Sequence, residues 1–184
     1  MKSLDESVFA IVGLGLMGGS LALALRAAGA CKAILGITRD PATLAKALTG
    51  RVIDEASQDL SLASKADVLV LATPVRTIIN HLGALAVLAR PGAIILDLGS
   101  TKQAIVRAME QLPSQLEPIG GHPMCGKEEF GFSAADVNLY RQAPFILSPL
   151  ARTSPDTLAF ARALVTAVGA RPVLLDPARH DRIM

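Results

Sequence analysis

One histidine of this 184-residue chain stands among residues that would let it react with a bound molecule. His122 lies in Gly-Gly-His-Pro-Met-Cys-Gly-Lys-Glu, residues 120–128, at the predicted transition from a strand to a loop. The flanking glycines allow another molecule to approach the backbone closely. A neutral imidazole accepts a proton near neutral pH, and a well-placed general base accelerates a reaction by about 10²–10⁴-fold. We therefore predict that His122 is a catalytic base; the alternative is a purely structural histidine.

A glycine-rich turn near the start of the chain predicts a dinucleotide site. It follows a predicted strand, Val8–Val12, and opens a predicted helix, Met17–Ala28. In such turns the first glycine permits a tight bend, the second admits the pyrophosphate, and the third lets the helix pack against the strand. Glycines that merely form a tight turn are the alternative. The residues expected to contact the cofactor here are Gly13, Leu14, Gly15, Leu16, Met17 and Gly18.

The residues that end the second predicted strand, Ala33–Thr38, favour NADP as the cofactor. NAD-binding versions of this turn carry an acidic residue here that binds the ribose. This chain has Thr38 followed by Arg39, so no carboxylate repels a 2′-phosphate, and the guanidinium can bind it. NAD stays possible because Asp40 could serve as the acid after a shift in register, although Asp40-Pro41 is typical of a helix start. Arg39 could also be a solvated loop charge.

Thr73 and Pro74 follow another predicted strand, Val68–Ala72, at the sheet edge where ligands bind. Their backbone could line the path toward the nicotinamide. A simple turn from strand to helix, with proline at the first helical position, explains them equally well.

A serine, Ser100, follows the strand predicted at Ala93–Leu98 at the same edge of the sheet. It precedes Gln103 by three residues, the spacing of a capping box, so Ser100 is predicted to cap a helix, to contact the ligand, or to do both. Asp97 is expected to be a structural carboxylate. Lys102 could neutralise an anion, but a position on the surface of the helix is favoured.

Alternation of short apolar strands with helical segments predicts an α/β protein, a Rossmann-type doubly wound, mostly parallel sheet with helices on both faces. The predicted strands are Val8–Val12, Ala33–Thr38, Val68–Ala72, Ala93–Leu98, Leu116–Gly120, Pro144–Ser148 and Pro172–Leu175. The predicted helices are Met17–Ala28, Pro41–Leu48, Arg76–Leu88, Lys102–Gln111 and Pro155–Val168. Gly29 and Gly169 are predicted to end the first and last of these helices.

Composition excludes several classes of protein. The chain is 51% hydrophobic and 18% charged with a net charge of +2, which is too weak to indicate nucleic-acid binding. Cys31 and Cys125 lack the spacing of a zinc site or disulfide framework, and no metal site is expected. Residues 8–25 are apolar enough to suggest a signal peptide or membrane span, but Asp5, Glu6 and the glycines argue against both. We expect a soluble, cytoplasmic protein with no membrane partner.

Four motifs occur in one order along the chain: Gly-Leu-Gly-Leu-Met-Gly-Gly-Ser-Leu-Ala at 13–22, Ala-Thr-Pro-Val at 72–75, Asp97-x-x-Ser100-x-Lys102, and Gly-Gly-His-Pro-Met at 120–124. Together they resemble the prephenate/arogenate dehydrogenase family of tyrosine biosynthesis. Thr38-Arg39, with Asp59 and Leu60, resembles its cyanobacterial-type, NADP-dependent arogenate dehydrogenases.

The resemblance implies oxidative decarboxylation of prephenate or arogenate, with hydride transfer to NAD(P)⁺, in L-tyrosine biosynthesis. It implies that His122 accepts the proton of the ring hydroxyl and that Ser100 hydrogen-bonds this hydroxyl and helps to orient the histidine. Glu128 matches a position near the site entrance that influences substrate binding. The choice between prephenate and arogenate stays open.

The resemblance also implies a C-terminal all-helical dimerisation domain, which this chain lacks. We expect residues 1–175 to form the dinucleotide-binding domain and residues 176–184 to begin the helical one, at Asp176-Pro177. The resemblance implies a homodimer for the full-length protein, and we expect this segment to be truncated and poorly active alone. His180-Asp181 resembles a pair at the start of that domain and is expected to help begin the helix.

Two other functions remain open from the sequence. One is another Gly-Leu-Gly-x-Met-Gly oxidoreductase, such as a β-hydroxyacid dehydrogenase or an imine reductase. The other is a non-catalytic module that senses dinucleotides. His81, in the middle of the helix Arg76–Leu88, is expected on a packed or surface face and not in catalysis.

Overall fold

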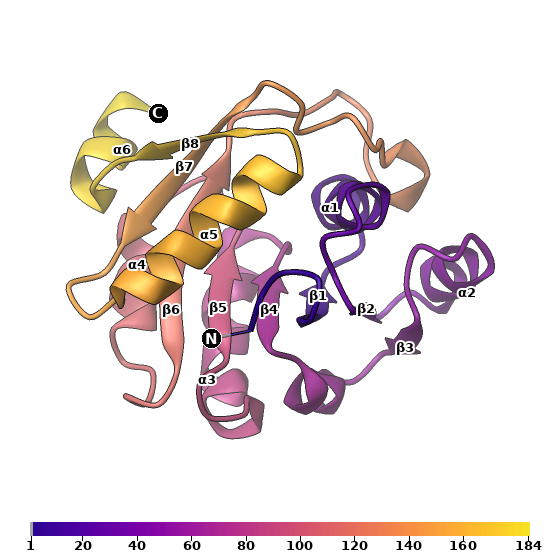
Figure 1. Ribbon diagram of the computed structural model, residues 1–184, viewed down its shortest axis with the longest axis horizontal. Coiled ribbons are helices and arrows are strands. Elements are labelled where there is room, and N and C mark those ends of the chain that lie inside the picture. The colour runs from indigo at the N-terminus through magenta and orange to yellow at the C-terminus, as the bar shows by residue number, and fades with distance from the viewer. Residues whose placement is uncertain (1) are drawn as a thin grey trace.

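An eight-stranded sheet forms the centre of this computed structural model, which describes residues 2–184 (Figure 1). The strand order is β3-β2-β1-β4-β5-β6-β7-β8. Every neighbouring pair is parallel except β6 and β7, which are antiparallel. The strands are β1 (Val8–Val12), β2 (Ala33–Ile37), β3 (Glu55–Ser57), β4 (Val68–Leu71), β5 (Ile94–Asp97), β6 (Glu117–Pro123), β7 (Pro144–Pro149) and β8 (Arg171–Leu174).

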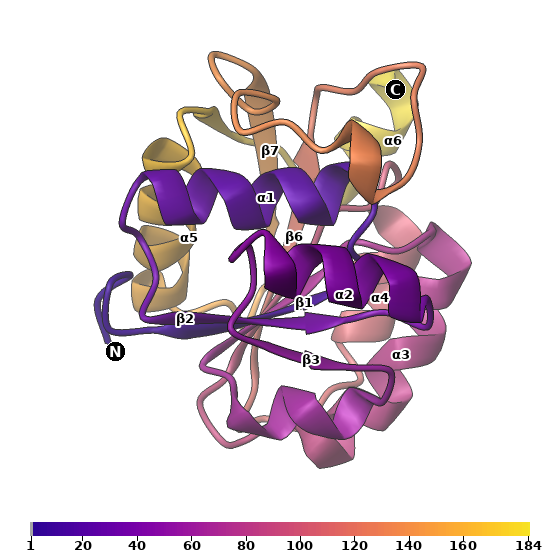
Figure 2. The same cartoon turned by 90° about the vertical axis from the view of Figure 1, so that its right-hand side faces the viewer.

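Helices cover both faces of the sheet (Figures 1 and 2). The α-helices are α1 (Leu16–Ala27), α2 (Pro41–Thr49), α3 (Val75–Leu88), α4 (Gln103–Met109), α5 (Pro155–Ala167) and α6 (Pro177–Ile183), and two 3₁₀-helices are η1 (Leu60–Lys65) and η2 (Phe132–Ala134). Buried side chains of α1, α2 and α5 pack on one face of the sheet, and those of η1, α3 and α4 pack on the other.

The central strands are apolar throughout because both of their faces are buried. In β1, Phe9 and Ile11 join the core beneath α1 and α5, whereas Ala10 and Val12 join the core beneath α3. This alternation follows from the two-residue period of a strand, and burial on both faces is the rule for parallel sheets. Among residues 2–184, no helix is both long and apolar enough to cross a membrane.

The predicted fold class is confirmed, and most element boundaries lie within two residues of their predicted positions. Asp40 caps α2 and Asp176 caps α6, each followed by proline as predicted. Gly29 and Gly169 follow α1 and α5 with φ of +60° and +80°, the left-handed conformation expected of glycines that end helices.

Three elements were missed by the sequence prediction: β3, η1 and η2. The strand β3 has only three residues, all half-buried, so it carries no apolar run to reveal it. The predicted strand Leu116–Gly120 also ends too early. In the structure β6 continues through Pro123 because it pairs with β7, and His122 lies opposite Ile146 within that ladder.

Candidate functional site

The glycine-rich turn after β1 has the geometry that a dinucleotide requires. Gly13 has a φ of +98°, and a Cβ built on it would lie 2.7 Å from the carbonyl oxygen of Ala72. A Cβ on Gly18 would lie 1.9 Å from the carbonyl oxygen of Gly13, so α1 can approach the turn only with glycine there. A Cβ on Gly15, in contrast, meets nothing within 4 Å. Two glycines therefore fix the turn, and the third leaves its backbone open to a ligand.

Beside this turn lies a cavity of about 420 Å³, at the carboxyl ends of β1, β2 and β4. This edge, where the strand order reverses between β1 and β4, is where ligands bind in doubly wound sheets. The hydroxyl oxygen of Thr73 is buried here without a hydrogen-bond partner among residues 2–184. The lining residues are Val12, Gly13, Ile37, Thr38, Arg39, Gln58, Leu60, Thr73, Pro74, Thr77, Asn80 and His81.

The structure thus brings Gly13, Thr38, Arg39, Thr73 and Pro74 together around one cavity. Four polar members of its lining were not predicted from the sequence: Gln58, Thr77, Asn80 and His81. His81 was expected on a packed or surface face, but it lines this cavity. Burial, followed by the positive charge of Arg39, lowers the pKa of its ring. The four-residue spacing of Thr77 and His81 on α3 was a signal that both share one helix face.

A buried ion pair lies at the end of β5 and anchors the strand that carries His122. Asp97 Oδ1 accepts a hydrogen bond from the N–H of Gly121 at 3.0 Å, and Oδ2 accepts one from Gly99 at 2.8 Å. Lys102 Nζ pairs with the same carboxylate and donates to the carbonyl oxygen of Gly121. Both backbone groups of Gly121 are therefore satisfied by this pair, directly before His122.

The predicted surface position of Lys102 is wrong. Its side chain is fully buried, as is that of Asp97. Burial raises the pKa of Asp97 and lowers the pKa of Lys102, while the attraction between the two groups opposes both shifts. A buried charge must be paired, and the aspartate predicted as a structural carboxylate is the partner that makes the burial of this lysine possible.

The capping role considered for Ser100 is also wrong, and Ser100 remains exposed. The helix α4 begins at Gln103, and its first N–H groups are bound by a carboxylate from α6. Asp181 Oδ1 accepts from the N–H of Lys102 at 2.6 Å, and Oδ2 accepts from that of Gln103 at 2.9 Å. A capping residue 78 positions away in sequence leaves no local signal.

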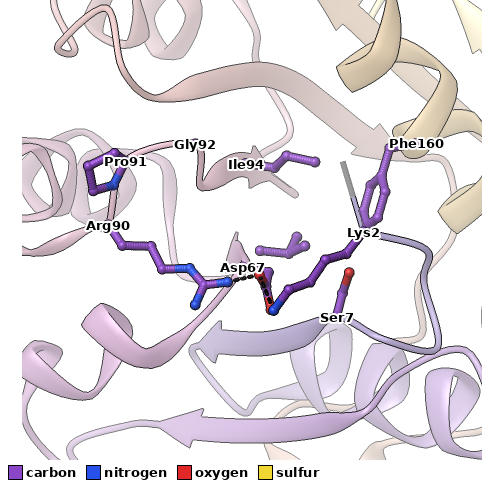
Figure 3. Close-up of a pocket in the computed structure, with 9 residues that line it drawn as sticks. Lys2, Ser7, Asp67, Arg90, Pro91, Gly92, Ile94 and Phe160 are labelled. Carbon is purple, nitrogen blue, oxygen red and sulfur yellow. Dashed lines mark hydrogen bonds and ion pairs between the residues drawn. The ribbon is translucent and has the colours of Figure 1, made fainter.

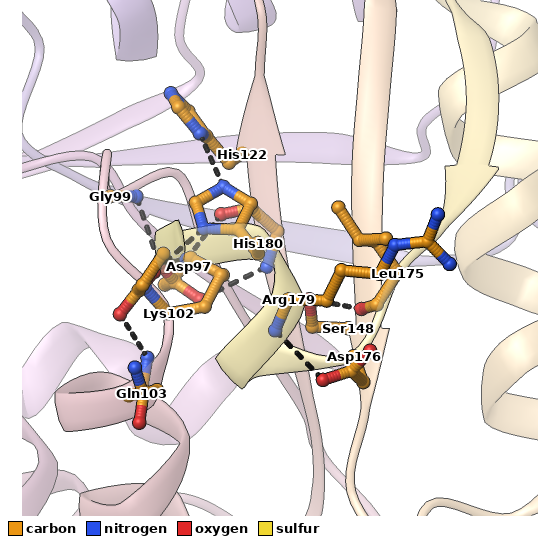
Figure 4. A network of polar contacts seen from close by, with 12 residues as sticks. Asp97, Gly99, Lys102, Gln103, His122, Ser148, Leu175, Asp176, Arg179 and His180 are labelled. Carbon is orange, nitrogen blue, oxygen red and sulfur yellow. Dashed lines mark hydrogen bonds and ion pairs between the residues drawn. The ribbon is translucent and has the colours of Figure 1, made fainter. Parts of the chain in front are cut away.

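His122 contacts a second histidine (Figure 4). Its Nδ1 lies 2.8 Å from Nε2 of His180, and Nδ1 of His180 lies 2.7 Å from Oδ1 of Asp181. His180 is fully buried, and the two rings meet edge to face at a centroid distance of 5.0 Å. The Nε2 atom of His122 points away from this contact (Figure 4). The helix start predicted within residues 176–184 is present, but its His-Asp pair also reaches the candidate base.

The environment of His122 keeps its ring uncharged at neutral pH. Partial burial is the main reason that the pKa of His122 is lowered to about 4; electrostatic interactions with His180 and Lys102 lower it further, and Asp181 opposes the shift. Such a ring can accept a proton. Cys125, three residues on, is a half-buried thiol whose pKa burial raises to about 11, so it is a poor nucleophile.

A second cavity, of about 180 Å³, lies at the opposite, amino-terminal edge of the sheet (Figure 3). Its polar centre is Asp67, which pairs with Lys2 and Arg90 and accepts a hydrogen bond of 2.9 Å from the N–H of Val8. Asp67 thereby ties the chain start to the loop before β5. These contacts give Asp67 a structural role, and its cavity lies away from the sheet edge that carries His122.

Comparison with known proteins identifies the family. The pattern of the prephenate dehydrogenase nucleotide-binding domain matches residues 21–174. The chain belongs to the prephenate dehydrogenase family. The prephenate dehydrogenase of Bacillus subtilis (strain 168) is 35% identical over 189 residues, an alignment that covers 100% of this chain and 50% of that protein. The chain thus spans about half the length of the curated relatives it matches.

Two solved structures of this family superimpose closely on the chain. The crystal structure of Synechocystis arogenate dehydrogenase has a TM-score of 0.90 at 39% identity and covers 96% of this chain and 62% of that one. Prephenate dehydrogenase from A. aeolicus, in complex with hydroxyphenyl propionate and NAD⁺, has a TM-score of 0.91 at 31% identity, covering 99% and 64%.

In this member of the prephenate dehydrogenase family, the predicted site residues lie in separate parts of the structure. One group surrounds the cavity beside the glycine turn. Ser100 and His122 follow or end neighbouring strands at the same sheet edge, since β1, β4, β5 and β6 run parallel. Glu128 is exposed in the loop after β6. His180 and Asp181 are the residues near His122 that sequence reasoning assigned only to a helix start.

Proposed function

We propose that this chain is the dinucleotide-binding part of an NADP-dependent prephenate or arogenate dehydrogenase that acts in L-tyrosine biosynthesis. The observation that carries the proposal is the position of His122 in the Gly-Gly-His-Pro-Met segment, at the same sheet edge as the open glycine turn. Membership of the prephenate dehydrogenase family supports it. Other oxidoreductases with this glycine turn are not favoured by the relatives.

In the proposed reaction His122 is the general base at the ring alcohol. Nε2 of His122 takes the hydroxyl proton as the ring carbon loses its hydride. The bond between the ring and its carboxylate then breaks, carbon dioxide leaves, and the electron pair of that bond makes the ring aromatic. The proton on His122 returns to the oxygen, which has become that of a phenol. Ser100 is proposed to hydrogen-bond the hydroxyl, and Glu128 to influence substrate binding near the entrance.

The residues around the large cavity fit a nicotinamide dinucleotide, which when bound supplies the hydride acceptor. Gly15 leaves room for the pyrophosphate in the turn that Gly13 and Gly18 fix, and the buried, unpartnered hydroxyl of Thr73 offers a hydrogen bond. NADP is favoured over NAD because Thr38 and Arg39, with no acid at the end of β2, line the cavity. Leu14, Leu16 and Met17 are proposed to complete the turn around the phosphates, and Pro74 to line the path to the nicotinamide.

Residues 1–175 are proposed to form the dinucleotide-binding domain, with a helical domain beginning at residue 176. Dimerisation of the complete protein and the low activity of this chain by itself belong to the same proposal. Its support is the length of the relatives, of which the chain spans about half.

The test is steady-state kinetics of the complete gene product with prephenate and arogenate, each paired with NADP⁺ and with NAD⁺. We expect one substrate to be oxidised with a higher kcat/KM for NADP⁺ than for NAD⁺. His122→Asn should lower kcat/KM by about 10²–10⁴-fold, the usual contribution of a general base. A protein that binds NADP⁺ but oxidises neither substrate would instead be a dinucleotide-sensing module, and the proposed activity would be wrong.

A further inference from the structure

The contacts of His122 specify which of its nitrogens carries the proton. A neutral imidazole has one N–H donor and one acceptor, and the hydrogen bond at one nitrogen decides the state of the other. Three side chains form a continuous series here. His122 Nδ1 lies 2.8 Å from His180 Nε2 (Figure 4), and His180 Nδ1 lies 2.7 Å from Asp181 Oδ1. We refer to these residues as the histidine triad.

Asp181 determines which nitrogen of His180 donates a hydrogen bond. This carboxylate accepts hydrogen bonds from the N–H groups of Lys102 and Gln103. Partial burial raises the pKa of Asp181, but these two bonds and the one to His180 outweigh burial, so the pKa lies below its usual value. An ionised carboxylate can only accept. His180 must therefore donate from Nδ1, and in its neutral form its Nε2 becomes an acceptor.

The position of the proton on His122 follows from its contact with His180. Since Nε2 of neutral His180 accepts, Nδ1 of His122 must carry the proton and donate it. The lone pair of His122 then lies on Nε2, the atom that points away from the triad (Figure 4). A free histidine in water favours the opposite tautomer, with the proton on Nε2, which could not accept a proton there. The triad thus selects the form of His122 that can act as a base.

We propose that His180 and Asp181 are positioning residues that hold His122 in its Nδ1–H tautomer and leave Nε2 free to take the substrate proton. The proposal rests on the proposed function for the identity of that proton. It makes α6, which follows the sheet, part of the active site, because α6 supplies both residues. Asp181 also caps α4, so one carboxylate joins α6 to the segment that holds Lys102.

The other charged groups near His122 do not supply this function. Lys102 carries a positive charge that lowers the pKa of His122, but its Nζ is used by Asp97 and by the carbonyl oxygen of Gly121. The carboxylate of Asp97 in turn accepts hydrogen bonds from Lys102 and from two backbone N–H groups. Among the described residues, His180 is the group within hydrogen-bond distance of the His122 ring.

The direct test is nitrogen NMR of the 184-residue chain labelled with ¹⁵N in its imidazole rings. The sequence has three histidines, so the spectrum should contain the signals of three imidazole rings, and single substitutions can assign them. We expect His122 and His180 both to show a protonated Nδ1 and an unprotonated Nε2 at neutral pH. A protonated Nε2 on His122, or a charged His180 that donates to it, would overturn the proposal.

His180→Phe keeps a ring in the buried space but removes the acceptor. We expect the His122 signal to shift toward the Nε2–H tautomer, and kcat/KM of the complete gene product to fall by about 10–10²-fold, the scale of one lost hydrogen bond to a buried group. The matched control is Asp176→Ala, which removes the cap of the same helix without touching the triad. It should lower the melting temperature and leave the His122 tautomer unchanged.

The outcomes separate the two proposals. If His122 has the expected tautomer but the complete protein oxidises neither substrate, the proposed function fails and the triad stands. If the complete protein is active and His180→Phe changes neither the tautomer nor kcat/KM, the triad has no positioning role. Should His180→Phe fail to fold, the tautomer of the unsubstituted chain still decides the matter.

Discussion

Lys102→Met tests whether the buried ion pair at the end of β5 holds the segment that carries His122. Methionine preserves much of the length and apolar character of lysine but removes the ammonium group. Asp97 then stays in a site from which water is fully excluded, with only the N–H groups of Gly99 and Gly121 as partners. The carbonyl oxygen of Gly121 loses its hydrogen bond at the same time.

Removing one partner of a buried ion pair typically costs about 3–5 kcal/mol, because the other charge is left uncompensated. For a protein of this size that loss lowers Tm by about 6–20 °C. Urea unfolding monitored by circular dichroism measures the change in the free energy of unfolding directly. The control is Lys65→Met, which breaks the exposed pair of Lys65 with Glu55 and should cost less than about 1 kcal/mol.

A double substitution separates the ion pair from simple packing. If the pair matters, Asp97→Asn combined with Lys102→Met should be less destabilising than the sum of the two single changes, by about 0.5–3 kcal/mol. Strict additivity, or a Lys102→Met cost as small as that of Lys65→Met, would refute the role assigned to the pair.

The acidic limb of kcat/KM against pH should lie well below 6.5, toward the pKa of about 4 of His122; a limb near 6.5 would contradict the environment described for the ring. Because this pKa is lower in the folded than in the unfolded chain, stability should be full above about pH 6.5 and fall as pH drops toward 4, as acid unfolding curves can show. Arg39→Gln should weaken NADP⁺ binding by about 10-fold or more in calorimetric titrations and leave NAD⁺ binding almost unchanged, whereas equal losses for both would remove its proposed role. Gly18→Ala should lower Tm because its Cβ would lie 1.9 Å from a backbone oxygen, but Gly15→Ala should keep Tm and lose cofactor affinity; the reverse pattern in melting and binding assays would exclude our reading of the turn.

Much of the fold could be predicted because its signals are local. Apolar runs such as Val68–Leu71 are buried on both faces, and the caps Asp40 and Asp176 act on their own helices. Gly18 is required by its close contact with the carbonyl oxygen of Gly13, earlier in the same turn. In each case the residues that decide the structure are close neighbours in sequence.

The site was harder to predict because its decisive contacts join distant segments. Lys102 follows a strand end and precedes a helix, which is typical of a surface lysine, and only the position of Gly121 in the next strand reveals why it is buried. His180 lies 58 residues from His122, and Asp181 takes the capping role considered for Ser100. Sequence periodicity carries no information on such pairings.

The most direct test of the account is the kinetics of the complete gene product and of its His122→Asn variant, with NADP⁺ and with prephenate or arogenate as substrate. We expect formation of NADPH together with release of carbon dioxide, and a loss of about 10²–10⁴-fold in kcat/KM for the variant while its affinity for NADP⁺ stays unchanged. An active enzyme in which His122→Asn has no effect on kcat/KM would contradict the central claim that His122 is the base.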